Sequence, residues 1–259
     1  GASGVWASRH PPTGAWSALE ELAAPSSDLR SKSVPPIVRL DAAGNAWAVW
    51  RRGNALDARR WTPAAGWGAT EVVAEVGTGF FRFDLAVGRM GHAAVAWYDP
   101  NTGLASVRRF DPVAGWAAIE PLSESGLVFA AHIGVDDAGN VMALWRQSGV
   151  VNWRRYSVDD GAWTAPALLI NDGLGSSTVC SYSTQLAVLP AGDALMLGCS
   201  GSFVFTARYD AGAGTWSAPD TGFFAGGGTF LALAANPAGD AVAAWSHFAF
   251  GPPEINRVY

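Results

Sequence analysis

The segment Asp41-Ala-Ala-Gly-Asn-Ala-Trp-Ala-Val-Trp50 decides the fold, because variants of it return four more times along the chain. The matching segments are Gly88–Trp97, Asp136–Trp145, Leu189–Gly198 and Asn236–Trp245. The glycine at the turn of each segment lies 47, 48, 53 and 47 residues after the one before; these are Gly44, Gly91, Gly139, Gly192 and Gly239. Such regular spacing predicts one structural unit repeated about five times.

A second pattern follows each of the first four segments, in which arginine precedes an aromatic residue and a tryptophan comes soon after. The instances are Arg59-Arg60-Trp61, Arg108-Arg109-Phe110, Arg154-Arg155-Tyr156 and Ala207-Arg208-Tyr209. Around these patterns each period holds four short runs of strand-forming residues separated by Gly, Pro and Asp. In the first period we expect strands at about Ile37–Asp41, Ala46–Arg51, Leu56–Thr62 and Ala69–Val73.

Four antiparallel strands in each 47 residues are typical of the blade of a β-propeller. A two-sheet sandwich is disfavoured, because it has no reason to repeat one motif at constant spacing, whereas each propeller blade packs on an equivalent neighbour. The chain resembles bacterial propeller repeats of the Asp-x-x-Gly-Asn-Ala-x-Ala-x-Trp type over nearly its whole length. The resemblance implies an all-β, single-domain β-propeller over residues 1–259 with about five four-stranded blades. It says little about function, since propellers include lectins, hydrolases and scaffolds.

The two ends of the sequence each supply half a blade. Val5–His10 and Gly14–Leu22 read as strands three and four, and Leu231–Ser246 reads as strands one and two. We therefore expect the N- and C-terminal strands to pair and close the ring, so that no strand edge stays open. Glu254–Tyr259 also reads as a third strand and is then surplus. The alternative is a structural scaffold fragment of a larger repeat protein with more blades.

Composition excludes several classes of function. Hydrophobic residues make up 49% of the 259, charged residues 15%, and there are thirteen tryptophans, so the chain has ample material for a core. A net charge of −5 with Lys32 as the single lysine argues against binding nucleic acid. No apolar run is long enough to span a bilayer. We expect a monomer without cofactor, and a native signal peptide stays undecided.

Polar residues recur at one height of the innermost strand. Counting back seven residues from the turn glycine gives Asp84, His132 and Gln185 in three adjacent blades. Five residues back the position is small in four blades, but Arg39 occupies it in the first. These side chains predict either a ligand site at one mouth of the central channel or ordinary hydrogen-bonded groups around a wet channel.

The loops on the same face as Asp84 are long and rich in aromatic residues. Phe81, Phe129 and Tyr182 lie there, and Arg82 directly precedes the inner strand of the second blade. Aromatic loops beside polar groups favour recognition of a carbohydrate or a protein partner, as in a lectin-like binding module. The alternative is that several of these rings fold inward and cap the core. The repeated tryptophans lie within strands, where they are expected to fill the space between blades.

Catalysis is less favoured than binding. The sequence contains no Gly-x-Ser-x-Gly segment, no phosphate-binding glycine loop and no His-Glu-x-x-His. Five-bladed propellers do include glycoside hydrolases, which need two carboxylates around the channel. Asp84 alone occupies an inner strand at that height, so a propeller-mouth glycoside hydrolase is the alternative function.

Cys180 and Cys199 are the only cysteines, and no nearby histidine pair completes a metal site. Both fall in or before strands one and two of the fourth blade, whose far ends an antiparallel hairpin brings together. We therefore predict a disulfide between them, with two buried thiols as the alternative. A disulfide indicates a secreted, cell-surface or periplasmic protein.

Overall fold

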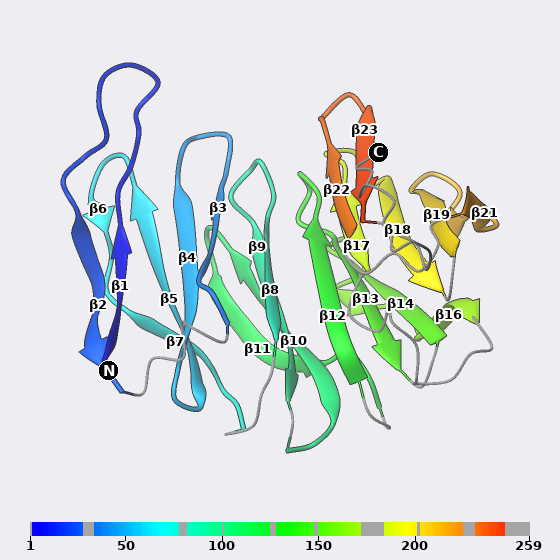
Figure 1. Cartoon of the computed structure of the whole chain (residues 1–259), viewed down its shortest axis with the longest axis horizontal. Helices are drawn as coiled ribbons and strands as arrows, with labels where there is room; N and C mark the ends of the chain where they lie inside the picture. The colour runs from blue at the N-terminus through cyan, green and yellow to red at the C-terminus, as the bar shows by residue number, and fades with distance from the viewer. Residues whose placement is uncertain are drawn as a thin grey trace, which may run out of the picture.

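The computed structural model describes residues 2–27, 34–77, 82–99, 101–124, 128–147, 150–171, 184–200, 203–224 and 231–246. In these ranges the chain forms antiparallel β-sheets and no helix, so the predicted all-β class is confirmed (Figure 1). Among the same residues no helix long and apolar enough to cross a membrane is found.

The first complete blade consists of β3 (Ile37–Leu40), β4 (Ala46–Arg52), β5 (Ala55–Thr62), β6 (Gly66–Trp67) and β7 (Glu71–Glu75). These strands pair in sequence order, and the fourth position of the blade is shared by β6 and β7, which both pair with β5. The four strands expected in this period are therefore present, with bounds that differ by a few residues.

Three further sheets repeat this arrangement. The second contains β8 (Phe83–Val87), β9 (Ala93–Asp99), β10 (Leu104–Asp111) and β11 (Gly115–Pro121). The third contains β12 (Val128–Val135), β13 (Val141–Gln147), β14 (Val150–Ser157), β15 (Ala162–Trp163) and β16 (Ala167–Asn171). The fourth contains β17 (Gln185–Val188), β18 (Ala194–Ser200), β19 (Phe203–Asp210), β20 (Thr215–Trp216) and β21 (Asp220–Phe224).

Half-blades are found at both ends of the chain. β1 (Ser3–Ala7) pairs with β2 (Glu20–Ser26), and β22 (Leu231–Ala235) pairs with β23 (Ala241–Trp245), as two separate sheets. In Figure 1 β1 and β2 lie at the left edge, whereas β22 and β23 lie in the right half, beyond β12. The predicted pairing of the two ends is thus not found among the described residues, and a closed ring of five blades is not confirmed. Glu254–Tyr259 lies outside those residues.

The repeated Asp-x-x-Gly-Asn motif builds the turn between the first two strands of a blade. Asp41 accepts hydrogen bonds from Asn45, through the backbone N–H at 2.8 Å and the side-chain amide at 2.6 Å. Asp136 and Asn140 make the same two bonds. Gly44, which lies between Asp41 and Asn45, has a φ of 81°, and this conformation favours glycine. The motif therefore recurs because the aspartate side chain accepts the hydrogen bonds that close each turn.

Alternating side chains of the second strand in each blade form the core. Trp47 and Val49 of β4 pack toward the second blade, whereas Ala48 and Trp50 pack on the β1–β2 half-blade. Trp50, Trp97 and Trp145 on the second strands are 1–3% exposed, which agrees with their predicted structural role. Trp16, for which the same role is predicted, is instead 68% exposed. In the fourth blade Gly198 replaces the tryptophan, and the ring of Phe205 on β19 occupies the space where a Cβ would lie. The Phe205 ring therefore fills the space next to Gly198.

The first arginine of each Arg-Arg pair binds the preceding blade. Arg108 on β10 donates hydrogen bonds of 3.0 Å to the carbonyl groups of Val72 and Val73 on β7. Arg154 reaches Pro121 of β11 in the same way, at 3.2 Å. Arg59 donates to Glu21 and Leu22 on β2, at 3.2 and 3.4 Å. β2 thus occupies the place of a fourth strand, as the sequence predicts.

The second arginine stacks on an aromatic ring of the following blade. The guanidinium of Arg60 lies 5.4 Å from the ring centroid of Phe110, and that of Arg109 lies 3.4 Å from the centroid of Tyr156. Arg9 lies over Trp61 at 4.3 Å, so β1 and the chain after it correspond to the third strand of a blade. Cation–π contacts of this kind add to the packing between blades.

Candidate functional site

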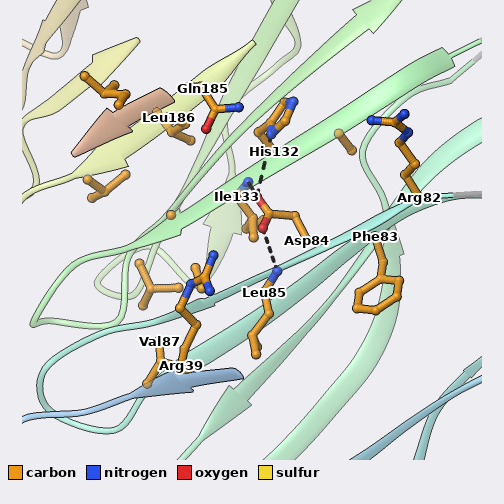
Figure 2. Close-up of a pocket in the computed structure, with 16 residues that line it drawn as sticks. Arg39, Arg82, Phe83, Asp84, Leu85, Val87, His132, Ile133, Gln185 and Leu186 are labelled. Atoms are coloured by element: carbon orange, nitrogen blue, oxygen red, sulfur yellow. Dashed lines mark hydrogen bonds and ion pairs between the residues drawn. The ribbon is translucent and has the colours of Figure 1, made fainter. Parts of the chain in front are cut away.

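The innermost strands of all five repeats line one cavity of about 450 Å³. Five of the residues predicted from the sequence lie around it: Arg39 on β3, Arg82 before β8, Asp84 on β8, His132 on β12 and Gln185 on β17 (Figure 2). Leu233 of β22 completes the lining. Residues separated by about 150 positions in the sequence are therefore brought together, because each lies on, or directly before, the innermost strand of its repeat.

Close packing of neighbouring inner strands shapes the cavity. A Cβ atom at Gly134 would clash with the side chain of Val188 on β17, so β12 and β17 can approach only with a very small residue here. Ile133 and Val135 on either side are buried. This explains why the third repeat has glycine at the fifth position before the turn glycine. Arg39 is tolerated in the first repeat because β3 is exposed on that side.

Asp84 and His132 form a pair across the second and third blades. Oδ2 of Asp84 lies 3.7 Å from Nδ1 of His132 and accepts a hydrogen bond of 3.2 Å from the backbone N–H of Ile133. Oδ1 accepts a bond of 2.8 Å from the N–H of Leu85. The carboxylate therefore joins the two inner strands and holds the imidazole beside the cavity.

The other nitrogen of the imidazole has no such partner. Nε2 of His132 is buried and finds no hydrogen-bond partner among the described residues. Buried polar atoms are normally hydrogen-bonded, and this one belongs to a side chain that lines the cavity. The carboxamide of Gln185, half-buried in the same lining, offers both a donor and an acceptor.

Two guanidinium groups line the cavity with this pair. The Arg39 side chain is exposed and donates a hydrogen bond of 2.9 Å to the carbonyl of Val38. Arg82 is exposed too. Among the described lining residues, Asp84 is the single carboxylate. The lining therefore combines hydrogen-bond donors and acceptors with an excess of positive charge.

The remaining predicted site residues are not placed. Phe81 and Tyr182 lie outside the described residues, and Phe129 lies within β12 without a described side chain. Tyr98, another aromatic of this face, is half-buried and packs against the core. The role of the aromatic-rich face thus stays a prediction, and Tyr98 shows the inward packing that was the alternative.

Cys199 is buried near the end of β18, and Cys180 lies outside the described residues. The described part of the chain contains no free cysteine. The same part contains no group of three or more His, Cys, Asp or Glu side chains arranged to hold a metal ion. The disulfide stays a prediction.

A second hollow was not anticipated from the sequence. It measures about 490 Å³ and lies between the β1–β2 half-blade and the first complete blade. Trp6, Trp16, Val38 and Leu40 are among its lining residues. The signal for it was present, since the N-terminal repeat lacks the first two strands of a blade and leaves the next blade uncovered.

Comparison with known proteins supports the fold. No protein-family model matches the sequence, and no curated protein is significantly similar to it. A triple arginine-to-alanine mutant of AofleA from Arthrobotrys oligospora superposes with a TM-score of 0.57 at 12% identity, over 95% of this chain and 74% of that one. A protein of unknown function from Dyadobacter fermentans gives 0.52 at 14% identity, over 82% and 74%. The Dos1 propeller gives 0.51 at 10% identity, over 81% and 51%. These similarities support a propeller and show the fold alone.

Proposed function

We propose that this chain is a non-catalytic binding module that holds a saccharide at the mouth of its central cavity. The observation that carries the proposal is the partnerless, buried Nε2 of His132 beside the Asp84 carboxylate, in a cavity of about 450 Å³. Cavities of roughly 300 to 1,000 Å³ are typical of small-ligand sites.

The chemistry of the lining suits a sugar better than an apolar ligand. Hydroxyl groups both donate and accept hydrogen bonds, and the lining offers an acceptor in Asp84, donors in Arg39 and Arg82, and both in Gln185. The positive excess favours sugars that carry a carboxylate or another anionic group. The aromatic-rich loops of the same face are the proposed continuation of the site.

Binding is favoured over hydrolysis by the state of Asp84. Glycoside hydrolases of the usual type need a pair of carboxylates flanking the scissile bond. The described lining supplies one, and both of its oxygens already accept backbone hydrogen bonds. We therefore assign Asp84 to positioning His132, with hydrolysis as an outcome of the test below.

A glycan array followed by titration calorimetry tests the proposal. Arg39→Ala and Gln185→Ala each remove one polar group from an accessible position, so each should weaken binding of a captured glycan by about tenfold. Arg89→Ala is the matched control, because Arg89 lies in the turn at the other end of β8 and should leave affinity unchanged. An array without signal, or affinities insensitive to both variants, would refute the proposal. Release of free sugar, abolished by Asp84→Asn, would indicate a hydrolase instead.

A further inference from the structure

The hollow between β1–β2 and the first complete blade is an apolar groove. Its floor and walls include Val5, Ala7, Leu22, Val38, Leu40 and Ala48. Val38 and Leu40 are 51% and 59% exposed. Large apolar side chains gathered in one concave surface mark a place where another apolar surface binds.

The other blades show what covers these positions. Leu85 and Ile133, which correspond to Val38 in the second and third blades, are only 2% and 4% exposed. Leu85 packs with Trp47 and Val49 of β4, and Ile133 packs with Ala94 and Ala96 of β9. In each case the cover is the second strand of the preceding blade. The groove therefore has the shape and chemistry to receive the first two strands of a blade.

β22 and β23 are such a pair of strands, with one face uncovered. Val242 on β23 is 73% exposed, whereas Trp47 and Met142, its counterparts in the first and third blades, are each 2% exposed. Those counterparts pack toward the following blade. The groove lacks a cover that β22–β23 could provide, and the Val242 face lacks the surface that the groove provides.

The β1–β2 sheet is ready to be completed. Among the described strands β1 pairs with β2 alone, whereas the third strand of each complete blade pairs on both sides. An unpaired strand edge is a template for a further strand. Addition of β23 next to β1 would produce the four-stranded order seen in the other blades.

Both half-blades are anchored to their own neighbours on different sides of the molecule. Val5 and Leu22 pack on Ala48 and Trp50, and Arg59 binds the backbone of β2. At the other end Leu197, Cys199 and Val204 pack against the strand pair, through the residues Leu231, Leu233, Ala243 and Trp245. Figure 1 shows the two half-blades well separated. A meeting within one chain would require the packed blades to turn against one another. A second molecule can supply the strand pair without that movement.

We propose that β22–β23 of a second copy of this chain docks in the groove and completes one blade from two molecules. The contact is head-to-tail, because the two surfaces that meet are different. Such contacts generate closed rings or open chains of molecules according to the angle between them. This inference is independent of the proposed saccharide site, which lies in the central cavity.

Light scattering after size exclusion, over a range of protein concentrations, measures the assembly. The wild-type mass should rise above the 27.0 kDa of one chain as concentration increases. Val38→Asp blocks the groove and Val242→Asp blocks the docking strand, so each variant alone should remain at the mass of one chain. Val113→Asp is the matched control, since Val113 is exposed and lies in the turn between β10 and β11. It should assemble like the wild type.

Mixing the two blocked variants gives the decisive result. Each retains the surface that the other lacks, so an equimolar mixture should form a dimer of one molecule of each and no larger species. A wild type that stays at 27.0 kDa at every concentration would overturn the proposal, as would blocked variants that still assemble or that fail to combine. The two faces would instead meet within one chain if the wild type is monomeric and the melting temperature falls in Val38→Asp and in Val242→Asp but not in Val113→Asp. Glycan binding by the blocked variants reports separately on the saccharide site.

Discussion

Equivalent residues make similar contacts in successive blades. In the second blade one such residue, Arg109, also forms an ion pair with a carboxylate. Arg109 binds the Glu120 carboxylate through Nε at 2.8 Å and Nη2 at 3.1 Å, while its guanidinium lies over Tyr156. Burial alone would raise the pKa of the Glu120 carboxyl, but the hydrogen bonds and charge of Arg109 outweigh it and lower that pKa below the ordinary 4.5. Arg109 therefore links two strands of one blade to the ring of the next.

This pair predicts a pH dependence of stability. Because the pKa of Glu120 is lower in the folded state, its contribution is fully present above pH 4.5 and is lost as the pH falls through the folded value. Glu120→Gln should reduce the free energy of unfolding at pH 7 and flatten its decline below pH 4.5. Urea unfolding of both proteins from pH 7 to pH 3 measures this. Parallel curves would show that Glu120 contributes nothing to the acid sensitivity.

At the scale of strands and turns, much of the molecule follows from the sequence. The turn glycines, the Asp-Asn hydrogen bonds and the strand tryptophans lie where the repeat predicts, because each depends on contacts within one blade. The cavity-lining residues Asp84, His132 and Gln185 were also found by counting, since register within a strand sets height. Counting did not predict side-chain partners such as the Asp84–His132 pair, because these partners depend on the distance between blades.

The arginines that bind the preceding blade give a prediction at this scale. Arg108 holds three backbone carbonyl groups, at Val72, Val73 and Ala117. Arg108→Ala should therefore lower the free energy of unfolding by about 1 to 3 kcal/mol, as for other hydrogen bonds from a charged donor. Arg108→Lys should recover only part of this, because one ammonium cannot reproduce the planar guanidinium. Thermal unfolding of the two variants and the wild type measures both effects, and equal stability of these three proteins would contradict the assigned role.

The fourth blade departs from this pattern, and its cysteines give another prediction. Ala207 stands where the first arginine stands elsewhere, so this side chain offers no guanidinium to the third blade. A disulfide between Cys180 and Cys199 would close a loop of about 20 residues and contribute roughly 3 kcal/mol. We expect the unreduced protein to take up no alkylating label, and reduction to lower its melting temperature. Two labelled cysteines in mass spectrometry of the unreduced protein would contradict the disulfide and the extracytoplasmic location inferred from it.

For the whole molecule, repetition predicts the blade but not the ring. Periodicity in the sequence specifies which residues face a neighbour, and every internal junction follows it. Closure depends on the angle that each junction adds, and that angle results from side-chain sizes such as Gly134 against Val188. The expected pairing of the two ends was based only on the number of strands. The number of strands does not give the angles between blades, so it could not predict that β1–β2 and β22–β23 form separate sheets.

The arginines on β5, β10 and β14 also set an order in time. Each binds the last strand of the blade that precedes it, so its partner strand is already made when the arginine leaves the ribosome. The last strand of a nascent blade therefore lacks these arginine hydrogen bonds until the third strand of the next blade has emerged. Because the fourth repeat has Ala207 at this position, the third blade does not receive the equivalent arginine hydrogen bonds. We expect synthesis to secure the N-terminal repeats one after another and to leave the C-terminal half the last to gain protection from proteases.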